Sequence, residues 1–252
     1  MRAVLTYHSI DSSGSAISVS ERDFRRHISW LASGRVRVVP LEKIATLGGD
    51  DDAVALTFDD AFKNFGTIAA PLLEEHSLPA TLFVVTELVG GTNAWRLPLR
   101  SEAIPVMPLL DWSGIAAVAQ RGIAIGSHGR THRHLTSLDA LDLYEEINGS
   151  SADLSRELGM TPTAFCYPYG DASSRERDEA ARLYNVAVTA ELRSLDDSDD
   201  PHLLPRLDAY YLREPRSLER FGSPAFERYL RLRRHGRRLR RSMEKLLGRD
   251  SA

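Results

Sequence analysis

A regular alternation of short apolar segments and amphipathic segments most restricts the fold of this chain. The apolar segments have the character of buried strands, and they cover residues 2–8, 36–39, 53–58, 80–85, 123–128, 163–168 and 185–190. Helical segments are predicted over residues 20–33, 40–47, 66–76, 111–122, 137–159 and 174–184. Strands that alternate with helices predict a parallel sheet, either open or closed into a barrel.

Length and composition restrict the class of protein further. The 252 residues suit one domain of α/β-barrel size or two smaller domains, and 42% hydrophobic with 27% charged residues is ordinary for a soluble globular protein. No apolar run approaches the roughly 18 residues of a membrane-spanning helix. The first residues lack the pattern of a signal peptide, so we expect a cytoplasmic protein. The one cysteine, Cys166, excludes an internal disulfide and a cysteine-based zinc cluster.

The net charge of −3 hides an asymmetry between the body and the end of the chain. Residues 226–252 carry a charge of +7, whereas the first 225 residues carry −10. We therefore predict one domain over residues 1–212, followed by a basic amphipathic helical tail over residues 213–252.

Residue types that enzymes use in catalysis follow several of the predicted strands. Asp59 and Asp60 follow the third strand, His8 ends the first, and His128 ends the fifth with His132 four residues later. The carboxyl ends of parallel strands meet at one edge of a sheet, where the active sites of such folds lie. The spacing of four residues also places the last two imidazoles on one face of a helical turn.

Two imidazoles and one carboxylate predict a catalytic metal site. Such a ligand set leaves an open coordination position, and a cation there lowers the pKa of a water toward ~7. Adjacent carboxylates repel each other unless a cation relieves the repulsion. One aspartate is therefore expected to bind the metal while its neighbour accepts a proton from the water. Zinc suits these ligands best, with cobalt, nickel or manganese as alternatives.

Three short motifs resemble those of a known enzyme family. TFDD at 57–60, SHGRTH at 127–132 and CYPYG at 166–170 resemble the first three motifs of the polysaccharide deacetylases, the NodB-homology domains of carbohydrate esterase family 4. LPATLFVV at 78–85 and LLPRLD at 203–208 are also similar to this family. The resemblance implies an α/β fold, a distorted (β/α) barrel of fewer than eight strands. It also implies metal-dependent removal of acetyl groups from N-acetylated sugars.

The resemblance assigns roles to individual residues. Asp59 corresponds to the general base of the family, and Asp60, His128 and His132 correspond to its metal ligands. Tyr169 corresponds to the tyrosine of the third motif, whose backbone N–H helps to bind the oxyanion of the tetrahedral intermediate.

The chain also departs from the family pattern. The arginine that opens the third motif and orients the base is Cys166 here. The late tryptophan motif and the late Leu-x-His motif, which supplies the catalytic acid, are missing. Some deacetylases of biofilm polysaccharides have a permuted order with YH near the start, and VLTYH of this chain is similar. We therefore predict that His8 is the general acid, with a histidine held by structural hydrogen bonds as the alternative.

Other residues near the motifs have weaker signals. Trp95, in the loose segment 87–108, and Tyr167 are predicted to contact the sugar, with a packing role as the alternative for both. We expect His134 to pack near the site rather than to bind the metal, and Cys166 to be a buried, inert thiol.

The basic tail allows three interpretations. It is an interfacial helix attracted to an anionic membrane surface, a non-specific contact for nucleic acid, or a helix that is solvated or docked on the acidic body. We expect no specific nucleic-acid partner, and a location peripheral to the membrane if the first interpretation holds.

These observations together predict a metal-dependent enzyme that removes an N-acetyl group from a polysaccharide or glycan precursor. The same site would suit an O-acetyl esterase or a hydrolase of a small amide. A third alternative is an inactive metal-binding domain that docks through its basic tail.

Overall fold

The computed structural model describes residues 1–49, 52–95 and 104–246. Its strands are β1 (Arg2–Tyr7), β2 (Ser9–Ile10), β3 (Ser18–Val19), β4 (Arg37–Val38), β5 (Ala53–Phe58), β6 (Ala80–Val84), β7 (Ala124–Ser127), β8 (Ala164–Cys166), β9 (Val186–Val188) and β10 (Leu207–Asp208). Its α-helices are α1 (Glu21–Ala32), α2 (Leu41–Ile44), α3 (Ala70–Glu75), α4 (Trp112–Gln120), α5 (Ala140–Tyr144), α6 (Ser150–Leu158), α7 (Ser174–Ala180) and α8 (Pro224–Leu246). The predicted strands and helices are all present.

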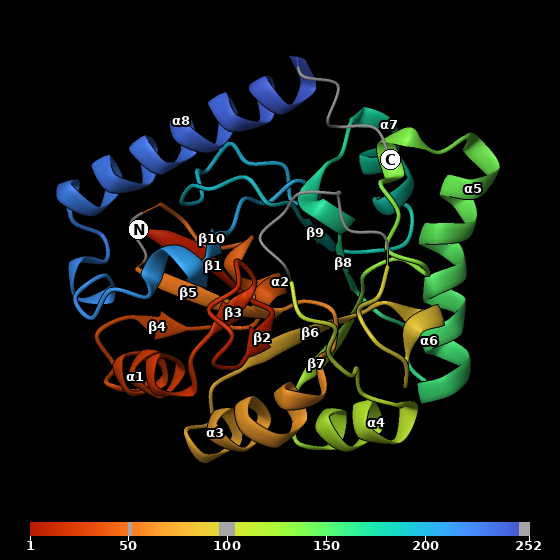
Figure 1. Cartoon of the computed structure of the whole chain (residues 1–252), viewed down its shortest axis with the longest axis horizontal. Helices are drawn as coiled ribbons and strands as arrows, with labels where there is room; N and C mark the ends of the chain where they lie inside the picture. Colours follow the sequence, from red (N-terminus) through yellow and green to blue (C-terminus); the bar gives the residue numbers. More distant parts are fainter. Residues whose placement is uncertain (50–51, 96–103, 247–252) are drawn as a thin grey trace.

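The main sheet is parallel and curled. Its strands follow the order β10-β1-β5-β6-β7-β8-β9, and the short β4 pairs with the start of β5, on the side that β6 occupies further along. The seven strands of the continuous order form a curled half-barrel, which confirms the predicted distorted barrel of fewer than eight strands (Figure 1).

Alternate residues of the central strands face two different environments. Val54 and Leu56 of β5 belong to the large apolar cluster that also contains side chains of α1, α3, α4 and α6. Ala53 and Ala55 belong to a second cluster, inside the curl of the sheet. Because side chains alternate along a strand, Thr57 and then Asp59 continue the inner row. The period of the strand therefore directs one of the two adjacent aspartates into the half-barrel.

The basic helix α8 packs on the body of the protein. Phe226 and Leu230 are buried, the Tyr229 hydroxyl donates a hydrogen bond of 3.0 Å to the carbonyl of Tyr211, and the Arg234 guanidinium lies 3.8 Å from Glu191. These contacts support the docked interpretation of the tail and give no support to membrane attachment. None of the helices in the described part of the chain has both the length and the apolar character needed to cross a membrane.

Candidate active site

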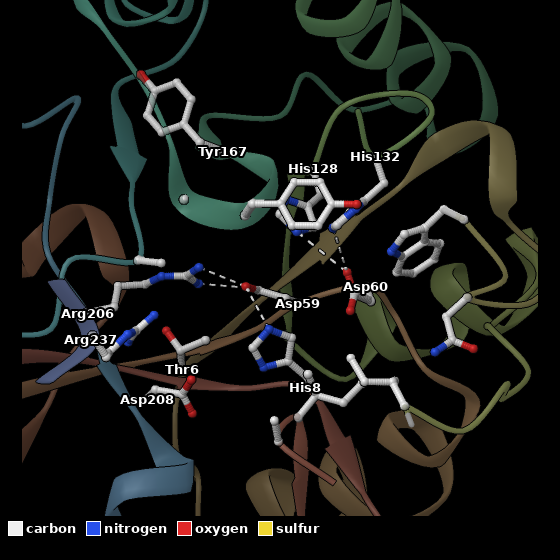
Figure 2. Close-up of a pocket in the computed structure, with 18 residues that line it drawn as sticks. Thr6, His8, Asp59, Asp60, His128, His132, Tyr167, Arg206, Asp208 and Arg237 are labelled. Atoms are coloured by element: carbon white, nitrogen blue, oxygen red, sulfur yellow. Dashed lines mark hydrogen bonds and ion pairs between the residues drawn. The ribbon is translucent and has the colours of Figure 1, made fainter. Parts of the chain in front are cut away.

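The predicted site residues meet at the carboxyl edge of the sheet. His8 directly follows β1, Asp59 and Asp60 follow β5, His128 follows β7, and His132 lies in the loop after it. They line one cavity of about 250 Å³ (Figure 2). The order of the strands in the sheet thus brings together residues that lie up to about 120 positions apart in the sequence.

Asp60, His128 and His132 have the geometry of a metal-binding triad. The Nε2 atoms of both histidines lie 3.5 Å from Oδ1 of Asp60. Nitrogen and oxygen ligands about 2.0–2.1 Å from a tetrahedral cation stand about 3.4 Å apart, which agrees with these separations. Oδ1 of Asp60 is buried and accepts no hydrogen bond from the described residues. The three residues therefore fit a divalent cation.

The protonation of the triad also fits a cation. Burial raises the pKa of the Asp60 carboxyl and lowers the pKa of His132 well below its ordinary value. Burial thus disfavours the negative charge of Asp60, which a bound cation would stabilise. It also keeps His132 in the neutral form that binds metals.

The backbone around the triad adopts strained conformations. Asp60, Ala61 and His132 have φ values of 71°, 57° and 59°, in the left-handed region that residues with a Cβ rarely adopt. Each such conformation raises the free energy of the folded state by about 1–3 kcal/mol, and it is kept only when the surrounding structure holds it. The surrounding structure therefore holds the turn after β5 and the loop after β7 in these conformations.

Hydrogen bonds from neighbouring elements orient the two histidines. Nδ1 of His128 lies 2.7 Å from the carbonyl oxygen of Cys166, so Nε2 points toward Asp60. The loop that carries His132 is bound by Glu146, whose Oε2 accepts hydrogen bonds from the backbone N–H groups of Arg130 (2.8 Å) and Thr131 (3.0 Å). Glu146 is buried, although its place in a predicted helix gave no signal of this role.

Asp59 forms a buried ion pair with Arg206. The two terminal nitrogens of the guanidinium donate hydrogen bonds of 2.8 Å to the two carboxylate oxygens. Burial alone would raise the pKa of Asp59, but the charge and the hydrogen bonds of Arg206 hold it well below its ordinary value. The carboxylate is therefore ionised at neutral pH.

Arg206 makes the contact with Asp59 that was expected of an arginine at position 166, where this chain has Cys166. Sγ of Cys166 lies 3.1 Å from Nη2 of Arg206 and 3.6 Å from Oδ2 of Asp59. The small side chain on β8 thus leaves room for an arginine that comes from the segment before β10. Cys166 is buried, as predicted, and burial raises the pKa of its thiol well above the ordinary value. The segment LLPRLD contained Arg206, but nothing in its pattern indicated a contact with Asp59.

His8 lies beside Asp59 at the cavity. Its Nε2 is 3.6 Å from Oδ2 of Asp59, and its side chain is 21% exposed. It can therefore reach both solvent and a ligand bound in the cavity. This position agrees with the predicted role.

Aromatic rings surround the triad. The Trp95 ring stacks on His132 with centroids 4.5 Å apart, and the Tyr169 ring meets His132 edge-on at 4.6 Å. His134 stacks on Tyr169 at 3.8 Å, in agreement with the predicted packing role. Trp95, His132 and Tyr169 also line an adjoining groove of about 690 Å³. The cavity and the groove thus share an aromatic wall.

Tyr167 is not placed to contact a sugar, as had been predicted, but has the packing role given as the alternative. It belongs to the wall of the cavity, but its ring points away from the catalytic cluster (Figure 2) and is fully buried. Its hydroxyl donates a hydrogen bond of 2.9 Å to the carbonyl of His202. The phenol therefore packs in the protein core and does not point toward a ligand in the cavity.

A comparison with known sequences gives the class of the protein. Residues 47–188, more than half of the chain, match the family described as polysaccharide deacetylase. The chain therefore belongs to the polysaccharide deacetylase family, as the three motifs predicted.

Individual relatives agree with this assignment, and a solved structure shares the fold. "Putative polysaccharide deacetylase YxkH" of Bacillus subtilis is 28% identical over 75% of this chain and 64% of that protein. The poly-β-1,6-N-acetyl-D-glucosamine N-deacetylase of Staphylococcus epidermidis is 28% identical over 34% of this chain and 31% of that protein. The chain thus spans less than two thirds of both relatives. The deacetylase PplD of Streptococcus pyogenes, solved with acetate, shares the fold with a TM-score of 0.69 at 21% identity, over 82% of this chain and 91% of that chain.

Proposed function

We propose that this protein removes the N-acetyl group from an N-acetylated saccharide with the help of a divalent metal. The observation that carries the proposal is the Asp60–His128–His132 triad, with Asp59 and His8 in the same cavity. Membership of the polysaccharide deacetylase family supports the same chemistry.

Asp60, His128 and His132 are proposed to hold the cation, with zinc as the first choice and cobalt, nickel or manganese as alternatives. When bound, such a cation activates a water for attack and polarises the acetamide carbonyl. Asp59, held as a carboxylate by Arg206, accepts the proton of the attacking water. The backbone N–H of Tyr169 is proposed to donate a hydrogen bond to the oxyanion.

His8 is proposed to donate a proton to the nitrogen as the bond between carbon and nitrogen breaks. An amine leaves poorly without this proton, so the reaction needs an acid on the side of the leaving group. His8 directly follows β1, and the permuted order of motifs would place the acid there. The products are acetate and a free amino sugar.

The lining of the cavity supports a saccharide substrate. Trp95 offers an aromatic ring next to the triad, and the adjoining groove gives room for sugar units beyond the one that reacts. The name of the Staphylococcus epidermidis relative gives poly-β-1,6-N-acetyl-D-glucosamine as its substrate. We therefore propose oligomers of N-acetylglucosamine as the first substrates to test.

Acetate release from a panel of N-acetylated and O-acetylated saccharides tests this proposal. We expect the zinc-loaded protein to release acetate from N-acetylated oligomers, and Asp60→Asn to abolish the release. His76→Ala, at an exposed histidine, is the control and should match wild type. Release from O-acetylated sugars alone would identify an esterase, and binding of zinc without any release would favour an inactive domain.

A further inference from the structure

Helix α8 brings one of its arginines to the active-site cavity. Arg237 is part of the cavity wall together with Thr6, Asp208 and the catalytic cluster, and Figure 2 shows it near Arg206 and Asp208. Arg237 lies beyond the match to the polysaccharide deacetylase family, which ends at residue 188, and outside the motifs that carry the resemblance.

The position of Arg237 is fixed by the helix that carries it. The buried Phe226 and Leu230 anchor the helix, and Arg234, three residues before Arg237, pairs with Glu191. The guanidinium of Arg237 lies 5.8 Å from the centroid of the Tyr211 ring, within range of a cation–π contact. Arg237 thus belongs to the docked face of the helix and not to the solvated one.

The charges at this end of the cavity cancel. The charge of Arg206 is balanced by its ion pair with Asp59. The remaining charged side chains at this end are the positive Arg237 and the negative Asp208. Oδ1 of Asp208 accepts a hydrogen bond of 2.9 Å from the backbone N–H of Tyr210, and the carboxylate retains further lone pairs. No carboxylate within residues 1–49, 52–95 and 104–237 forms an ion pair with Arg237.

A neutral group that is both donor and acceptor fits this pair best. A guanidinium only donates hydrogen bonds and a carboxylate only accepts them, whereas a sugar hydroxyl does both. An anionic group would be repelled by Asp208, and a cationic group by Arg237. We propose that Arg237 is a substrate-binding residue that donates hydrogen bonds to hydroxyl oxygens of a neutral sugar, and that α8 thereby completes the saccharide site. This inference rests on the proposed function.

The test measures saccharide binding and turnover separately. The dissociation constant of the trisaccharide of N-acetylglucosamine is measured by calorimetry, and KM and kcat by acetate release, for wild type, Arg237→Gln and Arg237→Lys. Arg233→Gln is the matched control, because Arg233 is exposed on α8 and lies over the Tyr229 ring.

We expect Arg237→Gln to raise the dissociation constant and KM by about tenfold to a hundredfold, the effect of losing a hydrogen bond from a charged donor. The kcat should stay within about twofold, Arg237→Lys should fall between, and the control should match wild type. Equal binding by Arg237→Gln and Arg233→Gln would overturn the inference. A larger loss for N-acetylglucosamine 6-phosphate than for N-acetylglucosamine would make Arg237 an anion-binding residue and would also overturn it.

The outcomes separate this inference from the proposed function. If wild type binds the trisaccharide but releases no acetate, the proposed function fails, and the ratio of dissociation constants alone decides the role of Arg237. If wild type neither binds nor hydrolyses any saccharide of the panel, both proposals fail.

Discussion

His8 and Asp59 are 3.6 Å apart, yet their proposed tasks are opposite. Arg206 holds Asp59 as a carboxylate that takes a proton, whereas His8 is to give one to the departing nitrogen. Only the second task depends on the leaving group, because a phenolate leaves without protonation and an amine does not. The two roles can therefore be separated by the choice of substrate.

We predict that His8→Gln lowers kcat on an N-acetylated saccharide by about a hundredfold or more, within the usual contribution of a general acid. The same variant should lose less than about tenfold on 4-nitrophenyl acetate, whose leaving group needs no proton. Steady-state kinetics on both substrates make this comparison. Equal losses on the two substrates would show that His8 does not act as the acid.

Arg206 and Cys166 share one space next to Asp59. We predict that Arg206→Ala lowers kcat strongly, because it leaves a buried carboxylate without its charged partner. The double variant Cys166→Arg with Arg206→Ala should recover part of the loss. The side chain at position 166 points toward Asp59, so an arginine there can pair with the same carboxylate. Acetate release with Cys166→Ser in the Arg206→Ala background is the control. Recovery by the serine variant as well would contradict this explanation.

At the scale of elements, the loop after β7 is shaped by the π-helical turn η4 (Glu145–Gly149). Glu146 binds the backbone of two loop residues ahead of His132. We predict that Glu146→Ala weakens zinc binding by about tenfold or more, as changes to the supports of metal ligands usually do. Competition with a chromogenic chelator measures the affinity. The exposed Glu145→Ala is the matched control, and equal affinities for the two variants would contradict the role of Glu146.

Helix α1 is joined to β1 by a buried histidine. His27 lies 3.1 Å from the Tyr7 hydroxyl through Nδ1 and 3.0 Å from the Leu212 carbonyl through Nε2. Burial lowers the pKa of His27 to about 4, although the bond to Leu212 opposes the shift. The unfolded chain, with a pKa of about 6.5, therefore binds a proton that the folded protein excludes below that pH.

This shift predicts a loss of stability in acid. As the pH falls from about 6.5 to about 4, His27 should lower the free energy of unfolding by about 3 kcal/mol. Above about pH 6.5 it should contribute no pH dependence. Urea unfolding at pH 7.5, 5.5 and 4.5 measures this, with His27→Gln expected to have the flatter profile. Parallel profiles for the two proteins would contradict the prediction.

Sequence patterns predicted elements well where those elements were long or periodic. β5 is a continuous apolar run, and its end marked the position of Asp59 and Asp60. β10 is two residues long, too short for any periodicity, and its pairing with β1 joins segments about 200 residues apart. Arg206 comes just before β10, so its contact with Asp59 depends on a pairing that no local pattern predicts. The role of Glu146 was also not predicted, because an acidic residue in a helix usually faces solvent.

At the scale of the whole molecule, the fold gathers a site from both ends of the chain. β1 lies between β5 and β10, so His8, Asp59 and Arg206 become neighbours although they come from three distant segments. Helix α8 closes over the same edge and adds Arg237 to the cavity. The residues of the local motifs, which include Asp59 as well as the metal ligands, were predictable from the sequence. The residues that orient the base and complete the cavity depend on the order of the strands.

Titration of the metal-free protein with zinc tests the central claim most directly. The chelated protein is titrated while acetate release from an N-acetylglucosamine oligomer is followed, for wild type and Asp60→Asn. We predict no release before zinc, a rise to a plateau at one equivalent for wild type, and no release at any zinc concentration for Asp60→Asn. Full release by chelated wild type that holds no residual metal would contradict the metal-dependent account.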